Sequence, residues 1–207
     1  MLARLLQLET QPKTETKTEL KTQSNKKVYP RYKYNLADGA NVVHIPNYVG
    51  DPNALFDELR LGIDWEKFKH VVYEKEFSSP RLMCILKFDK DISDEFPFLD
   101  IIKRRVEKIT HVKFRYAVLN YYRDGNDHIG YHSDREVANG NIVVSVSVGA
   151  TRRFKLKHKY RDDITHTFLL ANGDVLILNT AAIKTIYKHS VPKMANVGPR
   201  INITFRE

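Results

Sequence analysis

The sequence predicts an α+β fold in which a jelly-roll-like β core follows a region with two helices. Two segments before residue 113 carry apolar residues at helical spacing, and seven short segments after it have strand character. Turn signals such as Asp124-Gly125, Asn139-Gly140 and Asn172-Gly173 separate the strand segments. Short strands at regular spacing are typical of a sandwich or barrel, so we expect the β half to close around one core.

The first half of the chain is predicted to supply one strand and two helices. Asn41–Ile45 has the composition of a strand. Ala54–Leu61 predicts a helix, with Asp51 or Asn53 as its N-cap. Phe98–Ile109 shows a second helical pattern. The seven strands expected after these helices are Phe114–Tyr122, Ile142–Val148, Arg153–Lys159, Thr165–Leu170, Val175–Asn179, Thr185–His189 and Arg200–Phe205.

The start of the chain has a different composition from the rest. Residues 9–27 are rich in Thr, Lys, Gln and Glu, and Leu20 is their only large aliphatic residue. Such a segment buries too little apolar surface to offset the entropy of ordering, so residues 1–30 are predicted to form a flexible polar tail. Residues 31–207 are then expected to form one domain.

Composition narrows the class of protein. The chain has 207 residues with 34 Lys and Arg against 25 Asp and Glu, a formal net charge of +9 that favours polyanionic partners such as nucleic acid. No apolar run approaches the roughly 18 residues that a membrane span needs. The single cysteine, Cys84, excludes an intramolecular disulfide framework. We expect a monomeric intracellular protein, nuclear or cytoplasmic, without a secretion signal.

Three residues of the β half suggest a metal site. His132 and Asp134 lie two positions apart, which on a strand puts both side chains on one face. His189, on a later predicted strand, is a candidate third ligand. For the His132–Asp134 pair alone, the simpler interpretation is a solvated turn.

The last predicted strand carries polar residues at every second position. Arg200, Asn202, Thr204 and Arg206 share one face of it. Two guanidinium groups inside a β core would be costly unless they met an anion, and two arginines suit a dicarboxylate. Asn120 and Tyr122 alternate onto one face of another predicted strand and would complete such a pocket. The alternative for both arginines is ordinary exposed charge or phosphate contact.

Two histidines, one carboxylate and a dicarboxylate pocket indicate a non-haem Fe(II) site with open coordination positions. Together with segments 120–134, 145–149, 189–193 and 200–206, this pattern strongly resembles the AlkB family of Fe(II)- and 2-oxoglutarate-dependent dioxygenases. The resemblance covers about residues 40–207, and Arg-x-Asn-x-Thr-Phe-Arg at 200–206 is its most specific motif. Within the family the sequence is most similar to members that repair DNA.

The resemblance implies a fold, an activity and a set of roles. The fold would be a double-stranded β-helix, or jelly roll, with a nucleotide-recognition lid and supporting helices in residues 31–112 and the core in residues 113–207. The activity would be oxidative demethylation of alkylated nucleobases in DNA or RNA with release of formaldehyde, using Fe(II), 2-oxoglutarate and O2. This chemistry needs no side-chain general acid or base. The roles implied are iron ligation by His132, Asp134 and His189, and 2-oxoglutarate binding by Asn120, Tyr122 and Arg200 at one end and by Asn202 and Arg206 at the other.

A basic segment and a hairpin are the candidate nucleic-acid contacts. Arg153, Lys155, Lys157 and Lys159 alternate with apolar residues, which on a strand gives a row of cations about 6.6 Å apart. The alternative is the solvated outer face of an edge strand. By resemblance to duplex-repairing members, a hairpin before residue 82 would insert Val72 and Tyr73 between bases, with Arg81 on the strands. Ordinary hairpin packing is the competing interpretation.

The resemblance weakens between residues 82 and 97. The family's Tyr-x-aromatic-Ser-Gly segment, which contacts the flipped base, has no counterpart there, and Phe88 is the one obvious substitute or else a core residue. Glu136 is expected near the polar edge of the base. Two other functions stay open at this point, namely a 2-oxoglutarate-dependent hydroxylase of a protein or small molecule, and a non-enzymatic nucleic-acid-binding β-domain.

Overall fold

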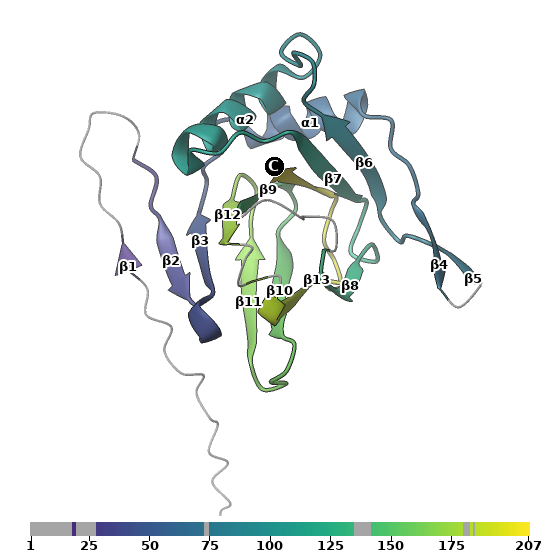
Figure 1. The fold of residues 1–207 in the computed structure, drawn as a ribbon. Coiled ribbons are helices and arrows are strands. Elements are labelled where there is room, and N and C mark those ends of the chain that lie inside the picture. Colours follow the sequence, from purple (N-terminus) through teal and green to yellow (C-terminus); the bar gives the residue numbers. More distant parts are fainter. Residues whose placement is uncertain (1–17, 20–27, 73–74, 135–141, 180–182, 184) are drawn as a thin grey trace, which may run out of the picture.

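Two antiparallel β-sheets and the helices α1 and α2 form the main body of the part of the chain that the structure describes (Figure 1). The computed structural model describes residues 18–19, 28–72, 75–134, 142–179, 183 and 185–207. Among these residues, no helix is long and apolar enough to cross a lipid bilayer. Most of the predicted tail lies outside the described residues; Thr18–Glu19 (β1) pairs with the strand at Tyr32–Asn35 (β2).

The larger sheet has eight strands, and its central strands come from the C-terminal half of the chain. Its order is β1, β2, β3 (Asn41–Ile45), β12 (Val175–Asn179), β9 (Ile142–Gly149), β14 (Arg200–Arg206), β7 (Tyr116–Tyr122) and β6 (Leu82–Lys87). Residues 31–112 therefore contribute strands to this sheet as well as helices.

The smaller sheet has four strands and carries part of the predicted site. Its order is β11 (Thr165–Leu170), β10 (Arg152–His158), β13 (Tyr187–Val191) and β8 (Ile129–His132). A separate hairpin, β4 (Lys69–Val72) paired with β5 (Lys75–Ser78), projects away from the sheets (Figure 1). The single turn of 3-10 helix, η1 (Ala37–Gly39), joins β2 to β3.

Both helices lie on the same side of the larger sheet (Figure 1). α1 (Pro52–Gly62) begins at Asp51, whose side chain accepts a hydrogen bond from the backbone N–H of Ala54 at 3.0 Å. α2 (Pro97–Thr110) has no cap from its own preceding residue. Instead, the carboxylate of Glu58 on α1 accepts from the first free N–H groups of α2, so one helix caps the other.

Two apolar clusters cover the two faces of the larger sheet. One packs the helices onto the sheet and includes Leu55, Leu59, Leu99 and Val106. The other fills the space between the sheets; its members include Val143, Phe154, Leu156, Leu176 and Tyr187. β9 and β14 lie between these clusters, so each strand gives one set of alternate side chains to the helices and the other set to the space between the sheets.

The predicted elements agree closely with the structure. Both helices, the strand at 41–45 and all seven later strands are present, although β13 begins and ends two residues later than predicted. The facing antiparallel sheets with two helices confirm the α+β class and are consistent with a jelly-roll core. The strands β1, β2, β6 and β8 were not predicted from the sequence. β6 is an edge strand whose apolar run lacks alternation, and β8 is short and contains Gly130.

Candidate metal centre and cosubstrate cavity

The three predicted metal ligands lie together. His132 is the last residue of β8, His189 lies directly opposite it on β13, and Asp134 follows β8 by two residues. One ligand atom from each of the three lies within 4.8 Å of the others. Asp134 Oδ1 is 3.4 Å from His132 Nε2 and 3.8 Å from His189 Nε2. Two imidazoles and one carboxylate at this separation match the ligand set that holds non-haem Fe(II) with positions left open.

Hydrogen bonds orient the ligands. His132 Nδ1 lies 2.9 Å from the carbonyl oxygen of Gly130, so this nitrogen donates and Nε2 keeps its lone pair for a metal. Arg206 Nη2 donates to Asp134 Oδ2 at 2.8 Å. The two oxygens of Asp134 therefore have separate partners: Oδ2 is held by an arginine, and Oδ1 faces both histidines.

The protonation states also suit a metal. Burial of Asp134 by itself raises the pKa of the carboxyl group, but the hydrogen bond with His132 and the electrostatic effects of His189 and Arg206 hold that pKa well below its ordinary value. Burial lowers the pKa of His189 to about 4, with Asp134 opposing this shift. At neutral pH the carboxylate is therefore charged and the His189 imidazole is neutral, which are the forms that bind metal.

A cavity of about 120 Å³ adjoins the three residues between the sheets. Asn120 and Tyr122 from β7 and Asn202, Thr204 and Arg206 from β14 line it, as the alternation of both strands predicted. The opposite face of β14 (Ile201, Ile203, Phe205) is fully buried in the cluster under the helices.

Arg200 lies deeper than the side chains that line the cavity. It is 1% exposed, and its guanidinium carbon is 5.4 Å from the centre of the Tyr122 ring. Nη2 donates to Ser147 Oγ at 2.8 Å, but Nε and Nη1 have no hydrogen-bond partner among the described residues. Burial lowers the pKa of Arg200 to about 10, so the group remains charged at neutral pH. The buried positive charge and the N–H donors of Arg200 Nε and Nη1 are the features that an acidic ligand would need for binding.

Asn202 is already occupied by protein partners. Its Nδ2 donates to Ser145 Oγ at 2.7 Å and to the carbonyl oxygen of Val146 at 3.0 Å, and its Oδ1 accepts from Thr204 Oγ1 at 3.1 Å. Both amide hydrogens are used, so Asn202 has no donor left for a ligand. The structure thus gives Asn202 a supporting position in the wall, whereas the sequence analysis expected it to contact the cosubstrate.

A wider groove of about 830 Å³ opens from two of these residues, His132 and Asp134. It lies between the β8 edge of the smaller sheet and the β6 edge of the larger sheet, and it shares His132, Asp134, Arg81 and Arg206 with the cavity. The candidate metal centre therefore lies where a small cavity meets a larger groove.

Comparison with known proteins agrees with this geometry. The profile of the 2OG-Fe(II) oxygenase superfamily matches residues 41–206. The chain belongs to the 2OG-Fe(II) oxygenase superfamily. The name of this superfamily specifies Fe(II) and 2-oxoglutarate, which are therefore the metal and the cosubstrate that its members share.

Relatives carry AlkB-homologue names, which confirms the resemblance noted from the sequence. The human protein named DNA oxidative demethylase ALKBH2 is 38% identical over 121 residues, covering 54% of this chain and 46% of that protein. The mouse protein named Alpha-ketoglutarate-dependent dioxygenase alkB homolog 3 is 34% identical over 121 residues, with 53% and 42% covered. The chain spans about half the length of these curated relatives.

Solved structures support the fold of this oxygenase. The structure of OsALKBH1 has a TM-score of 0.56 at 17% identity and covers 80% of this chain and 96% of its own. A 2OG-Fe(II) oxygenase family oxidoreductase from Burkholderia pseudomallei has a TM-score of 0.55 at 16% identity, with 80% and 84% covered. At these identities the likeness concerns the fold alone.

The residues present fit the iron and the cosubstrate of the superfamily. His132, Asp134 and His189 supply the donor set for Fe(II). The unpartnered Arg200 nitrogens, together with an unpartnered Arg206 Nε, supply buried cationic donors of the kind that a dicarboxylate would satisfy.

The structure changes the interpretation of two predicted base contacts in this oxygenase. Arg81 is 7% exposed and lies at the wall of the cavity and groove, not on the outer surface of the hairpin. Phe88 stacks on Phe205, with ring centres 6.0 Å apart, and packs against the cluster under the helices. Phe88 lines neither the cavity nor the groove, which favours the alternative of a core residue.

Other predicted nucleic-acid contacts are described in part or not at all. Val72 ends β4, and β4 pairs with β5, so the predicted hairpin is present. The side chain of Val72 and the whole of Tyr73 and Glu136 lie outside the described residues. Their predicted roles stay predictions.

The basic row lies on the outer face of the smaller sheet. Arg153, Lys155 and Lys157 alternate with buried residues on β10, and Lys159 follows the strand. β10 has β11 on one side and β13 on the other, so the alternative of a basic edge strand is wrong. Lys157 pairs with Asp162 at 2.7 Å, while Lys188 on β13 lies opposite Lys157 and extends the row.

Several residues of the site were given no role from the sequence. Ser145 and Ser147 hold Asn202 and Arg200, and both lie in segment 145–149, which contributed to the family resemblance without a role for either serine. Arg152 is fully buried and donates to the carbonyl oxygens of Asp124, Asp127 and Pro192, which fixes the loop before β8. Because Arg152 directly precedes the basic row in the sequence, its buried structural role was not predicted. Alternation along β10 was the signal that could have separated Arg152 from Arg153.

Proposed function

We propose that this chain oxidatively removes N-methyl groups from alkylated nucleobases in DNA or RNA, with residues 31–207 as the catalytic domain. The observation that carries the proposal is the position of His132, Asp134 and His189 beside a small cavity that Arg81 and Arg206 help to line, where a larger open groove meets that cavity. The names of relatives, which include DNA oxidative demethylase ALKBH2, favour a nucleobase as the substrate.

In this proposal the protein's own residues bind and orient the reactants. His132, Asp134 and His189 hold Fe(II), and Arg206 keeps Asp134 in position. Arg200, Tyr122 and Asn120 take one carboxylate of 2-oxoglutarate, and Arg206 stabilises the charge near the metal-binding end. When bound, iron and 2-oxoglutarate supply oxidation of a C–H bond by O2, with 2-oxoglutarate converted to succinate and CO2. The hydroxymethyl group on nitrogen then leaves as formaldehyde.

The groove between β8 and β6 receives the base in this proposal. A base must leave the stack to reach a metal inside a protein. The groove opens directly from His132 and Asp134, and the β4–β5 hairpin comes just before β6, one of its walls, in the chain. Val72 and Tyr73 at the end of the hairpin would fill the gap left in a duplex, and Glu136 would contact the polar edge of the base.

The outer face of the smaller sheet provides the phosphate contacts in this proposal. Arg153, Lys155, Lys157 and Lys188 lie on neighbouring strands of this face. The chain's formal charge of +9 is consistent with a nucleic-acid partner.

A panel of methylated oligonucleotides tests the function. The full chain, loaded with Fe(II) and supplied with 2-oxoglutarate, is incubated with single- and double-stranded DNA and RNA that carry N-methylated bases. Mass spectrometry of the bases and a formaldehyde assay report demethylation. We expect equal amounts of restored base, formaldehyde and succinate with at least one substrate.

Asp134→Ala is the matched control for this assay. It removes the ligand and leaves the sheets intact, so we expect no turnover with the same far-ultraviolet circular dichroism. Succinate formation without restored base on any oligonucleotide would favour the alternative of a protein or small-molecule hydroxylase. Oligonucleotide binding with no metal-dependent turnover of 2-oxoglutarate would favour the non-enzymatic alternative.

A further inference from the structure

Arg81 occupies the junction between the cavity and the groove. It lines both, and only 7% of it is exposed. Nε donates to Asn120 Oδ1 at 2.6 Å and Nη1 donates to Ser79 Oγ at 3.1 Å, so both known acceptors are uncharged. Among the described residues, Arg81 makes no ion pair. Burial of a guanidinium that has only neutral partners destabilises the fold. The hydrogen bond to Asn120 is the interaction that this burial makes possible.

The hydrogen bond from Arg81 decides which way the Asn120 amide faces. Guanidinium nitrogens only donate, so the Asn120 atom opposite Nε must be the carbonyl oxygen. The NH2 group then points away from Arg81. Within the described part of the chain, Nδ2 of Asn120 has no hydrogen-bond partner, and Asn120 belongs to the cavity wall. Asn120 therefore offers its amide hydrogens, and not its oxygen, to a ligand in the cavity.

Neighbouring contacts hold Arg81 itself in place. Arg123 Nη2 donates to the carbonyl oxygen of Pro80 at 2.9 Å, and the same guanidinium is bound to the carboxylate of Asp127. The segment from Ser79 to Arg81 is thereby fixed to the loop between β7 and β8. This bracing makes the bond between Arg81 and Asn120 a constant feature of the cavity.

We propose that Arg81 is a positioning residue for the cosubstrate, acting through Asn120. This inference rests on the proposed use of 2-oxoglutarate. With Arg81 present, Asn120 donates to a carboxylate of 2-oxoglutarate. Without it, the amide is free to rotate by half a turn and place its oxygen against the carboxylate, which is repulsive. Arg81 thus determines cosubstrate affinity without touching the cosubstrate.

Direct binding of 2-oxoglutarate tests this role. The full chain is loaded with Mn(II) in place of Fe(II), and 2-oxoglutarate is titrated in by calorimetry without nucleic acid. We expect Arg81→Leu and Asn120→Ala each to weaken binding about three- to ten-fold, the range for one hydrogen bond. The double variant should bind no more weakly than Asn120→Ala alone, because Arg81 acts only through Asn120.

Two further variants separate orientation from charge and folding. Asn120→Asp keeps an oxygen for Arg81 but turns a second oxygen to the cosubstrate, so we expect the greatest loss of affinity. Arg81→Gln retains an NH2 donor toward Asn120 and should bind 2-oxoglutarate more tightly than Arg81→Leu. Arg104→Leu, on the outer face of α2, is the matched control and should bind as the unaltered chain does.

The outcomes distinguish this inference from the proposed function. Unchanged affinity in Arg81→Leu, or additive losses in the double variant, would overturn it. No binding of 2-oxoglutarate by the unaltered chain would remove the proposed function and the inference together. Binding that follows the expected pattern without demethylation of any oligonucleotide would support the role of Arg81 and remove the nucleobase substrate. With an active substrate, Arg81→Leu should raise KM for 2-oxoglutarate and leave kcat near its original value.

Discussion

The carboxylate of Asp134 illustrates how a side chain is prepared for a metal before the metal binds. One oxygen faces two imidazoles, while the other accepts a short hydrogen bond from Arg206. A carboxylate held in this way keeps its orientation and its charge, so little reorganisation is needed on metal binding. The same principle applies to His132, whose Nδ1 is directed at the carbonyl oxygen of Gly130.

Replacing Arg206, which donates a hydrogen bond to Asp134, is expected to weaken metal binding. Arg206→Gln keeps an amide near Asp134 Oδ2 but loses the charge-assisted hydrogen bond. Partners of metal ligands typically contribute 10- to 100-fold to affinity, so we expect the dissociation constant for Mn(II) to rise by about 10-fold or more. Calorimetry measures this directly. Arg104→Gln serves as the control, and equal affinity in both variants would contradict the assigned role of Arg206.

The strands at the centre of the larger sheet each serve the core and the site. On β9, Val144, Val146 and Val148 pack under the helices, whereas Ser145 and Ser147 face the other way and bind residues of β14. Alternation gives this division without any insertion or bulge. The stability of the sheet and the shape of the cavity therefore depend on the same strands.

The turn before β12 is fixed by a buried carboxylate. Asp174 accepts hydrogen bonds from His44 Nε2 at 2.9 Å and from the backbone N–H groups of Asn47 and Ala171 at 2.9 and 3.0 Å. Burial raises the pKa of Asp174, but these hydrogen bonds outweigh it and lower the pKa below the ordinary value. Asp174 thus ties the end of β3 to the β11–β12 turn.

The sign of this shift predicts a pH dependence of stability. Because the folded-state pKa of Asp174 is below the unfolded value of about 3.9, its charge stabilises the fold above that pH, and the contribution is lost as pH falls through the folded-state pKa. We expect Asp174→Asn to lower the free energy of unfolding by about 2 kcal/mol at pH 7, with the difference shrinking below about pH 4. Urea unfolding at several pH values measures it. A difference that is constant with pH would show that the charge of Asp174 is not involved.

Much of the architecture could be predicted from the sequence because local patterns specify it. β14 alternates polar and apolar residues over its whole length, and the apolar set is fully buried. The candidate metal ligands were predictable because His132, Asp134 and His189 occur together with the Arg-x-Asn-x-Thr-Phe-Arg motif at 200–206, whereas the spacing of His132 and Asp134 alone was not sufficient. β6 could not be predicted, because it is an edge strand whose run of apolar residues does not alternate with polar residues.

What the sequence could not predict depends on partners far away in the chain. Asn202 has no donor left for a ligand because of Ser145, which lies 57 positions before it. Arg81 acts at the cavity because its guanidinium meets Asn120, 39 positions later. Phe88 joins the core through Phe205. Such contacts arise from the pairing of β6, β7, β9 and β14, and no local pattern carries them.

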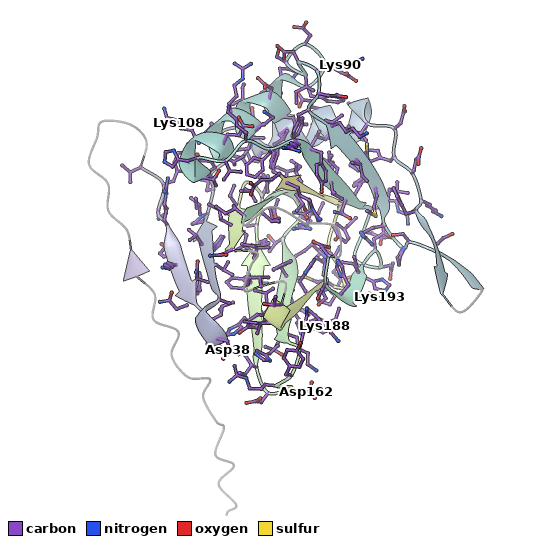
Figure 2. The ribbon with its side chains drawn as sticks, in the orientation of Figure 1. Asp38, Lys90, Lys108, Asp162, Lys188 and Lys193 are labelled. Atoms are coloured by element: carbon purple, nitrogen blue, oxygen red, sulfur yellow. The ribbon has the colours of Figure 1, made fainter. Side chains whose placement is uncertain are left out.

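Lysines lie at both ends of the described part of the molecule, so the place where nucleic acid binds can be tested by comparing two sets of lysines. Figure 2 shows Lys90 and Lys108 beside the helices and Lys188 at the other end of the protein. Replacing Lys155, Lys157 and Lys188 together by Gln should weaken oligonucleotide binding and reduce the dependence of log affinity on log salt by about 2.7, because each of the three phosphate contacts contributes about 0.9. The matched control replaces Lys87, Lys90 and Lys108, all exposed, and removes the same net charge. Fluorescence anisotropy at several salt concentrations measures both slopes. If the two triple variants change the slope equally, net charge alone attracts the oligonucleotide, and the outer face of the smaller sheet has no specific part in binding.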